Sequence, residues 1–423
     1  MTLERAPMTA RSASRPVAAT APAASAARPT RLRSLDVLRG VTIAAMMLVN
    51  KQGNDQGYAA LQHVPWHGAT PTDWIFPFFL FMVGVALPFS IASRRRQGAS
   101  NAEILRHAFW RALILFALGM FEKNFPFLST TWETVRIPGV LQRIGFCYFA
   151  GTALVLYTTR KQQGIIAATL LVGYWLLLAF VPVPGIGVVP MTREFAAQNW
   201  AAWIDQVTMG RHLGYGNHTW DANGLLSSLP SIVTLQAGVL AAWILEGGLT
   251  AAATRRLALA GAIGVILGWV WGGFQPVIGL GIIGEPAALH ALVFPINKML
   301  WTSTYVLYTA GVAFLSLAAC LWLVDLRKTD TEAPRWTMPF VVLGTNAIFA
   351  YLASGLVAKL LNVWTVAAGD GTRVSWWEWT QQHVFAPLIP SAPLASLVHS
   401  SVYALVWILI CAWLYRRRLF LKL

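Results

Sequence analysis

The stretch TPTDWIFPFFLFMVGVALPFSIASRRR, residues 70–96, decides the fold of this chain. It opens with residues that can cap a helix, continues as an apolar run of membrane-spanning length, and ends in three arginines. Because about 20 helical residues cross the hydrocarbon core of a bilayer, the stretch predicts a transmembrane helix over 71–93. Thr72 or Asp73 can cap that helix at its first turn. Capping explains Asp73 without any function, and a role in catalysis or substrate binding is the alternative.

The rest of the chain repeats this pattern. Of its 423 residues 56% are hydrophobic and only 12% are charged, whereas a soluble domain carries about 25% charged residues. This composition excludes a soluble surface and predicts an all-α, polytopic helical bundle. The predicted spans are 34–52, 71–93, 105–122, 138–158, 164–182, 226–246, 257–274, 300–324, 339–361 and 395–415. The Trp- and Pro-rich stretch 374–393 is an interfacial, re-entrant or eleventh spanning segment, so ten or eleven spans are expected.

The positions of Lys and Arg predict the orientation. With the N-terminus in the cytoplasm, the inner segments hold 19 of these residues and the outer loops hold seven. Cytoplasmic loops of membrane proteins carry the excess of Lys and Arg, so both termini are predicted to be cytoplasmic. The same asymmetry accounts for most of the net charge of +15. It argues against a nucleic-acid partner and leaves the lipid bilayer as the expected surroundings.

Composition also divides the chain into two parts. Residues 1–30 are dominated by Ala, Pro, Arg, Ser and Thr and are predicted to form a disordered basic arm. The transmembrane domain is predicted to occupy residues 31–423. Cys147, Cys320 and Cys411 all lie in apolar runs, so neither a disulfide framework nor a cysteine-based metal site is expected.

The two longest polar loops, about 183–225 and 362–394, face the outer side in this orientation. They are rich in aromatic and imidazole rings, among them Trp200, Trp203, His212, Tyr215, His218, Trp220, Trp376, Trp377 and Trp379. Such rings suit either stacking on a carbohydrate or the aromatic belt of a membrane interface.

Ionisable residues in or beside spans are costly and therefore mark candidate sites. Asp36 and Arg39 lie three residues apart on one face of the first predicted helix, where they can pair. The alternative is that Arg39 is presented to an anionic ligand from the cytoplasm. Asn50 ends the same helix, roughly 16 Å further along its axis. That distance is comparable to an extended pantetheine arm.

Further candidates map to the outer half of the predicted bundle. His63 lies in a short Pro-containing loop, where a histidine titrates near neutrality and can act as base or nucleophile; a merely solvated histidine is the alternative. Arg143 lies about two turns inside its span and needs a partner or a wet cavity. Lys298 can snorkel outward, and Asn297 beside it adds a donor and an acceptor. Asn50, His63, Asp73, Arg143 and Lys298 share this depth, which argues for one site.

The motifs in their order along the chain resemble one known family. They are SLDVLRG leading to MMLVN, HVPWHGATPTDWIFPFFLFMVG, RIPGVLQRIGFCYF, WDANGLLSSLPSIV, PINKMLWTSTYVLY and PFVVLGTNAIFAYL. The resemblance is to the heparan-α-glucosaminide N-acetyltransferase family, transmembrane acetyltransferases of lysosomes with many bacterial relatives. It covers about residues 31–415.

This resemblance implies transfer of an acetyl group from cytoplasmic acetyl-CoA to the amine of a glucosamine unit on the far side of the membrane. The family's catalytic histidine corresponds to His63, its essential asparagine to Asn50, and the arginine that opens the RIPGVLQR motif to Arg136. The PINK motif gives Asn297 and Lys298.

The chain departs from the family pattern in two respects. His67 stands where the family commonly has asparagine. No counterpart is expected for the lumenal N-terminal domain of the lysosomal enzyme, which contributes to its assembly. A bacterial amino sugar or envelope glycan is therefore expected as the acceptor in place of heparan.

We therefore predict an acetyl-CoA-dependent acetyltransferase in the bacterial inner membrane, without a metal, and leave a homodimer open as its oligomeric state. The predicted catalytic residues are His63 and Asn50; the cofactor-binding residues are Arg39, Arg143, Asn297 and Lys298; the substrate-binding residues are Asp73, Arg136, Asn346 and Trp66. Direct transfer and an acetyl-histidine intermediate both remain open. The rival hypothesis is an amino-sugar transporter, for which midplane polar residues and inverted repeats are typical.

Overall fold

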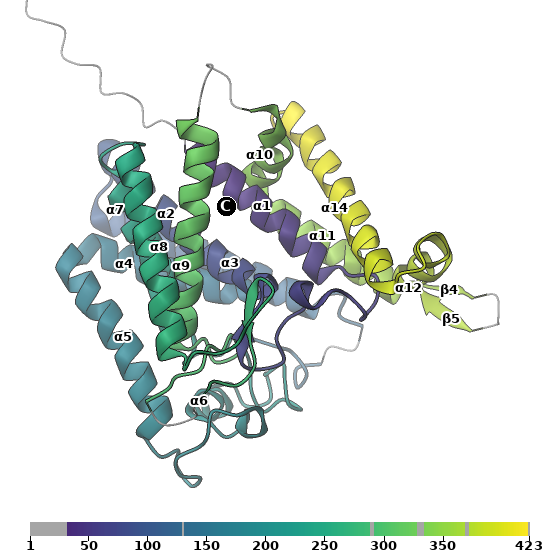
Figure 1. Cartoon of the computed structure of the whole chain (residues 1–423), viewed down its shortest axis with the longest axis horizontal. Helices are drawn as coiled ribbons and strands as arrows, with labels where there is room; N and C mark the ends of the chain where they lie inside the picture. The colour runs from purple at the N-terminus through teal and green to yellow at the C-terminus, as the bar shows by residue number, and fades with distance from the viewer. Residues whose placement is uncertain (1–31, 129–130, 288–291, 328–333, 369–371, 422–423) are drawn as a thin grey trace, which may run out of the picture. The chain divides into compact units, whose positions relative to one another are not determined.

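The apolar runs of the sequence fold into helices that run between the two ends of one bundle (Figure 1). The computed structural model describes residues 32–128, 131–287, 292–327, 334–368 and 372–421. Its helices are α1 Arg33–Asn50, α2 Pro71–Arg96, α3 Asn101–Asn124, α4 Val140–Tyr157, α5 Arg160–Phe180, α6 Trp200–Met209, α7 Ser228–Leu245, α8 Ala251–Trp271, α9 Ser303–Cys320, α10 Met338–Thr345, α11 Ala347–Val363, α12 Trp376–Thr380, α13 Ala386–Leu388 and α14 Ala392–Arg416. The predicted basic arm, residues 1–30, lies outside the described residues.

Every predicted span coincides with helix, which confirms the all-α polytopic fold class. Eight described helices are long and apolar enough to cross a membrane, and the bent pair α10–α11 makes up to nine. The first predicted span, α1, is not among them; its first two turns carry Arg33, Asp36 and Arg39. The stretch 374–393 forms only short helices, so it is not an eleventh spanning helix.

The ninth predicted span is broken at Asn346, where α10 and α11 meet at an angle of 74°. Asn346 is fully buried at this break. Its Nδ2 donates to the carbonyl oxygen of Leu419 at 3.3 Å, and its Oδ1 accepts from the backbone N–H of Leu421 at 3.0 Å. The amide therefore holds the segment after α14 against the break.

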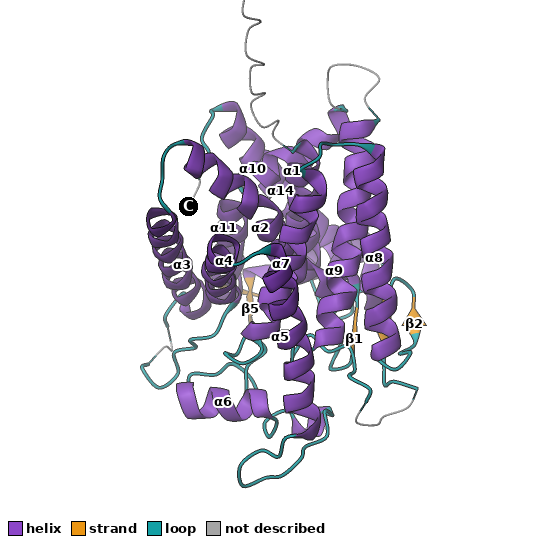
Figure 2. Ribbon diagram, turned by 90° about the vertical axis from the view of Figure 1, so that its left-hand side faces the viewer, coloured by secondary structure: helices purple, strands orange, loops and turns teal. Residues whose placement is uncertain are grey.

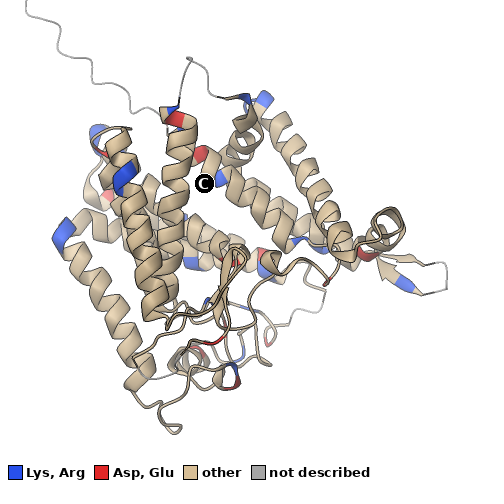
Figure 3. Cartoon of the chain, viewed as in Figure 1, with Lys and Arg blue, Asp and Glu red and all other residues tan. Residues whose placement is uncertain are grey.

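The helix ends gather on two sides, which we call the terminal end and the loop end. At the terminal end the backbone N–H of Ser34 donates to Asp325, and Arg160 at the start of α5 pairs with Glu246 after α7. α1 begins and α14 ends there, and Lys and Arg lie mainly at the helix ends (Figure 3). The loop end holds the long connections, including α6 (Figure 2). Which end faces the cytoplasm stays a prediction.

Glycines allow the central helices to approach closely. α2 packs along α7, α1 along α10, α3 along α4 and α8 along α9. A Cβ built at Gly84 of α2 would lie 1.9 Å from the carbonyl oxygen of Leu235, and one at Gly238 of α7 would lie 1.9 Å from that of Phe81. No side chain fits at such distances, and small residues at helix contacts are typical of membrane bundles.

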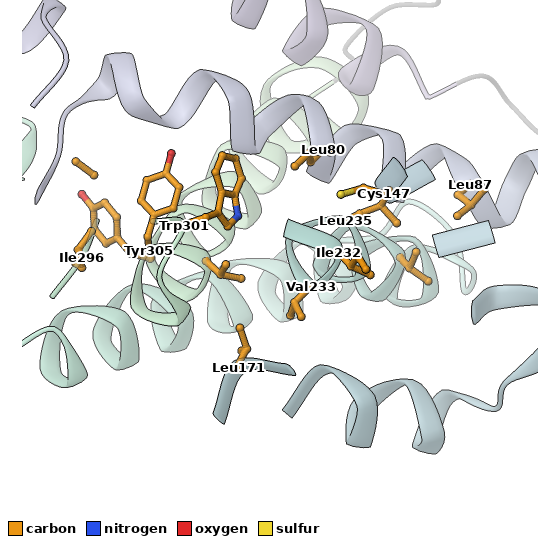
Figure 4. Packing of buried hydrophobic residues seen from close by; sticks show 14 of the residues in the cluster. Leu80, Leu87, Cys147, Leu171, Ile232, Val233, Leu235, Ile296, Trp301 and Tyr305 are labelled. Atoms are coloured by element: carbon orange, nitrogen blue, oxygen red, sulfur yellow. The ribbon is translucent and has the colours of Figure 1, made fainter. Parts of the chain in front are cut away.

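The core between these helices also fixes the start of α2. Leu80, Leu235, Trp301 and Tyr305 belong to one buried cluster (Figure 4). The hydroxyl of Tyr305 donates to the backbone carbonyl of Asp73 at 2.6 Å. Packing in the bundle thus positions the first turn of α2 at the loop end.

Short strands tie the loop end together. β1 Gly68–Ala69 pairs antiparallel with β3 Gly281–Ile283, which pairs with β2 Val277–Ile278. A second hairpin consists of β4 Thr365–Ala367 and β5 Arg373–Ser375. The first sheet holds the segment before α2 against the segment before α9, although they lie more than 200 residues apart in the sequence.

Candidate active site

His63, Asp73 and Lys298 meet at the loop end. Nδ1 of His63 lies 2.7 Å from Oδ1 of Asp73 and 2.8 Å from Nζ of Lys298, and Nζ lies 3.0 Å from the same Oδ1. An ionised carboxylate only accepts hydrogen bonds, so we assign Nδ1–H as a donor to Asp73, with Lys298 donating to the same oxygen. In that tautomer Nε2 carries the lone pair. The side chain of His63 is 43% exposed whereas that of Asp73 is fully buried, so a buried carboxylate orients an accessible base.

Asp73 also closes the first turn of α2. Its Oδ2 accepts from the backbone N–H of Thr70 at 3.1 Å, from the Thr70 hydroxyl at 3.1 Å and from the backbone N–H of Val64 at 3.2 Å. These contacts form a capping box whose N-cap is Thr70 and whose N3 residue is Asp73. Of the two predicted capping residues, Thr72 and Asp73, only Asp73 takes part. The capping interpretation of Asp73 is confirmed, and its other oxygen contacts His63 and Lys298.

Asn297 fixes the turn that carries Lys298. Its Oδ1 accepts from the backbone N–H of Leu300 at 2.9 Å, and its own N–H donates to the hydroxyl of Thr302 at 3.0 Å. Asn297 is fully buried, and its Nδ2 lies 3.4 Å from Nδ1 of His67. These contacts are structural, and its predicted role in cofactor binding stays a prediction.

His67 lies near this cluster but differs from His63 in its environment. Its side chain is 1% exposed, and burial lowers its pKa to about 4, so its ring is neutral at pH 7. The next residue, Gly68, has φ +114, and a Cβ there would lie 2.1 Å from the carbonyl oxygen of Ile282. Only glycine fits at this point, where the loop crosses β3.

His63 lines a cavity of about 410 Å³, which we call the central cavity, together with Asn50 and Lys298. It is also lined by four charged residues that the sequence analysis did not assign to a site: Lys51, Glu122, Lys123 and Lys359. Nζ of Lys359 lies 3.4 Å from Oε1 of Glu122 and donates to the backbone carbonyl of the same residue. The signal for Glu122 and Lys359 was their ionisable side chains inside apolar helices.

Two further cavities share lining residues with the central cavity. Towards the terminal end, a terminal cavity of about 360 Å³ is lined by Arg39 and Arg111. It has Phe79, Val140 and Tyr351 in common with the central cavity. At the loop end, a polar loop cavity of about 900 Å³ shares Asn50, Lys51 and His63 with it. The three cavities therefore adjoin one another through the bundle, with His63 at the junction of two.

Two arginines line the terminal cavity. Nη1 of Arg39 lies 3.2 Å from Oδ1 of Asp36, which confirms that the two residues pair. The guanidinium of Arg111 lies 5.1 Å from the ring centre of Tyr148. Arginine suits the binding of phosphate groups.

Arg136 lines the central cavity and is held from two sides. Its Nε and Nη2 donate to the two carboxylate oxygens of Asp221 at 2.8 and 2.9 Å, and its guanidinium lies 5.0 Å from the ring centre of Tyr215. Tyr215 in turn stacks on Trp220, with ring centres 4.7 Å apart. The predicted role of Arg136 in substrate binding stays a prediction.

Arg143, Trp66 and Asn346 do not line any of these three cavities. Arg143 is fully buried; it donates to the hydroxyls of Ser227 and Ser228 and lies 4.8 Å from the ring centre of Trp301. Trp66 donates its indole N–H to the carbonyl oxygen of Met191 at 2.7 Å. The contacts described for all three connect parts of the fold, and their predicted ligand-binding roles stay predictions.

Within the five described ranges, no group of three or more His, Cys, Asp or Glu side chains is arranged to hold a metal ion. The expectation that no metal is required remains a prediction.

Comparisons with known proteins find one matching family model and two similar relatives. A family model described as heparan-alpha-glucosaminide N-acetyltransferase, catalytic, matches residues 31–210. The heparan-alpha-glucosaminide N-acetyltransferases of Mus musculus and Homo sapiens are 26% and 27% identical over 93% and 94% of this chain. The chain spans about 60% of the length of each relative. Neither name favours the transporter hypothesis, and these matches show that the chain is similar to the heparan-α-glucosaminide N-acetyltransferases, in its first half by the family model and along most of its length by the two relatives.

Proposed function

We propose that this chain is a membrane acetyltransferase that moves the acetyl group of acetyl-CoA to the amine of a glucosamine-type sugar. The observation that carries the proposal is the cluster of His63, Asp73 and Lys298, in which His63 and Lys298 line a cavity that adjoins two others through the bundle. An oriented base at the meeting point of two cavities suits a reaction between two substrates. The names of the two relatives support acetyl transfer to glucosamine.

The donor would enter from the terminal end. Arg39 and Arg111 supply two cations for the phosphates of coenzyme A. From Arg39 to Asn50 the α1 helix rises roughly 16 Å, a length that suits the pantetheine arm. The arm would pass Phe79 and Tyr351, which line both the terminal and the central cavity. The predicted excess of Lys and Arg on this side supports a cytoplasmic terminal end.

The chemistry follows from the tautomer of His63. Nε2 takes a proton from the acceptor amine, whose nitrogen attacks the thioester carbon; the carbon–sulfur bond then breaks, and the thiolate of CoA takes up the proton. Asp73 fixes the ring and stabilises its charged form, and Lys298 donates to the same carboxylate oxygen and holds Asp73 in place. Asn50, which lines the same cavity, would donate its amide N–H to the oxyanion.

A second route has the acetyl group carried by His63 itself. Nε2 attacks the thioester, free CoA leaves, and the amine then attacks the acetyl-imidazole. Initial rates at varied concentrations of both substrates distinguish the routes: intersecting lines indicate direct transfer, and parallel lines indicate the acetyl-histidine route.

The finer identity of the system is also a proposal. We expect an amino sugar or envelope glycan as the acceptor, the bacterial inner membrane as the location, and either a monomer or a homodimer as the assembly.

The test is release of the CoA thiol from acetyl-CoA by the purified protein when glucosamine is added. His63→Ala should lower this rate by about 10²–10⁴ without lowering the melting temperature. His383→Ala is the matched control, because His383 is exposed at the loop end and lines none of the three cavities. Full activity in His63→Ala, or no glucosamine-dependent release by the unaltered protein, would contradict the proposal.

A further inference from the structure

Many of the residues that line the loop cavity carry amide side chains. They are Asn50, Gln52, Asn54, Gln62, Asn362, Gln381 and Gln382. Each amide offers both donors and an acceptor, as a sugar hydroxyl does. At about 900 Å³ the loop cavity is more than twice the volume of the central cavity, within the range typical of small-molecule sites.

Several of these amides are held in place before any ligand binds. Nε2 of Gln52 donates to the carbonyl oxygen of Leu61 at 2.7 Å, and Nε2 of Gln62 donates to that of Asp55 at 3.0 Å. Nδ2 of Asn362 donates to the carbonyl oxygen of Ala358 at 2.8 Å. A polar lining that is already ordered reduces the entropic cost of binding.

Gln381 provides an independent sign of a missing ligand group. It is 4% exposed, and its Oε1 lies 3.1 Å from Nδ1 of His399. The ring of His399 is stacked between Trp377 and Phe385, with ring centres 4.6 and 4.7 Å away, so the position of the ring beside the amide is fixed. Its Nε2 is buried with no hydrogen-bond partner in the described structure. A buried donor without a partner is costly, and an acceptor on a ligand in the loop cavity would satisfy it.

The charges of the two adjoining cavities differ in sign. The loop cavity is lined by the carboxylates of Asp55 and Glu378 and by one cation, Lys51. The central cavity is lined by four lysines, one arginine and one glutamate: Lys51, Lys123, Lys298, Lys359, Arg136 and Glu122. An amino sugar is a cation at pH 7, so the loop cavity attracts it, whereas the sulfate of a sulfated amino sugar cancels that charge and is itself repelled by the two carboxylates.

We infer that the loop cavity is the acceptor subsite and that it takes an unsulfated amino sugar, with hydroxyls on the amides and the ammonium group led past Glu378 towards His63. The inference rests on the proposed acetyl transfer. It adds to the proposed function the place where the acceptor binds and the charge that the acceptor carries.

The test is direct titration of glucosamine and of glucosamine 6-sulfate into the purified protein. Glu378→Gln keeps the oxygen that accepts from Nε2 of Gln382 at 2.9 Å, so it removes only the charge. We expect Glu378→Gln to weaken glucosamine binding about tenfold and to raise the KM for glucosamine by the same factor. The kcat and the affinity for acetyl-CoA should not change. Gln381→Leu should weaken the binding of both glucosamine and glucosamine 6-sulfate. Glu194→Gln, an exposed loop-end residue outside the loop cavity, is the matched control.

The unaltered protein should bind glucosamine at least tenfold more tightly than glucosamine 6-sulfate. Glu378→Gln should reduce this difference in affinity. Unchanged glucosamine affinity in both Glu378→Gln and Gln381→Leu would overturn the inference, as would equal or tighter binding of the sulfate. Acetyl transfer that persists in that case leaves the proposed function intact. Conversely, Glu378-dependent glucosamine binding without any acetyl transfer would keep the subsite and refute the enzyme activity.

Discussion

Replacing Asp73 by asparagine tests the arrangement of the candidate active site most directly. Three donors, two on Thr70 and one on Val64, point at Oδ2 of Asp73. The asparagine must therefore place its carbonyl oxygen there and its NH₂ group towards His63. Because the NH₂ group of the asparagine is a donor, Nδ1 of His63 has to accept its hydrogen bond. The proton of the ring therefore moves to Nε2. Nε2 then has no lone pair with which to take a proton from the amine.

We expect kcat of Asp73→Asn to fall about 10³-fold, which corresponds to roughly 4 kcal/mol in activation free energy. This lies within the contribution of about 10²–10⁴ that general-base catalysis makes. The cap is retained, and the side chain of Lys298 is 17% exposed, so its ammonium can turn into the central cavity. The loss of stability should therefore stay near 1–3 kcal/mol, which a thermal melt measures.

The assay is glucosamine-dependent CoA release in a double-mutant cycle. If Asp73 acts through His63, Asp73→Asn should change the residual rate by less than about threefold in the His63→Ala background. Equal losses in both backgrounds would refute this reasoning, as would an unimpaired Asp73→Asn.

Three further predictions concern residues with separate roles. His67→Asn should lower stability by about 1–2 kcal/mol, because it removes a buried ring, yet keep kcat within about threefold; an abolished kcat in a folded protein would contradict this. Arg111→Ala should weaken acetyl-CoA binding about tenfold, measured as a smaller thermal stabilisation by the ligand, whereas Arg106→Ala on the same helix, exposed and outside the terminal cavity, should not. Burial raises the pKa of Asp205 in α6 to about 7, so the folded state holds its proton up to near pH 7 and stability falls as pH rises from about 4 to 7. Asp205→Asn should therefore raise stability by up to about 4 kcal/mol at pH 8 and by less than half as much at pH 5, and an equal gain at both pH values would show that ionisation is not the cause.

The sequence by itself determined the helices and their approximate limits. Apolar runs of membrane-spanning length are a local property, because each helix satisfies its own backbone hydrogen bonds. All ten predicted spans accordingly coincide with helix. The pairing of Asp36 with Arg39 and the capping role of Asp73 were also predictable, since both arise within one or two turns.

The depth in the membrane that the sequence predicts for each residue was enough to locate part of the candidate site. Asn50, His63, Asp73 and Lys298 were predicted to share one level in the bundle, and the structure brings the last three into contact, with Asn50 on the same cavity. Depth does not specify which side of a helix faces which neighbour. It therefore did not separate these residues from Arg143, whose guanidinium is surrounded by protein groups.

Only the tertiary structure decided which distant residues meet. Lys298 reaches His63 because the turn braced by Asn297 pairs with the loop before α2, across 235 positions of sequence. Likewise, Lys359 of α11 meets Glu122 of α3, and Asn346 breaks a predicted straight span by binding the segment after α14. Hydropathy records how deep a residue lies. Its partners depend on how helices are rotated and packed against one another, which is set by close contacts such as that between α2 and α7 and by turns at the loop end.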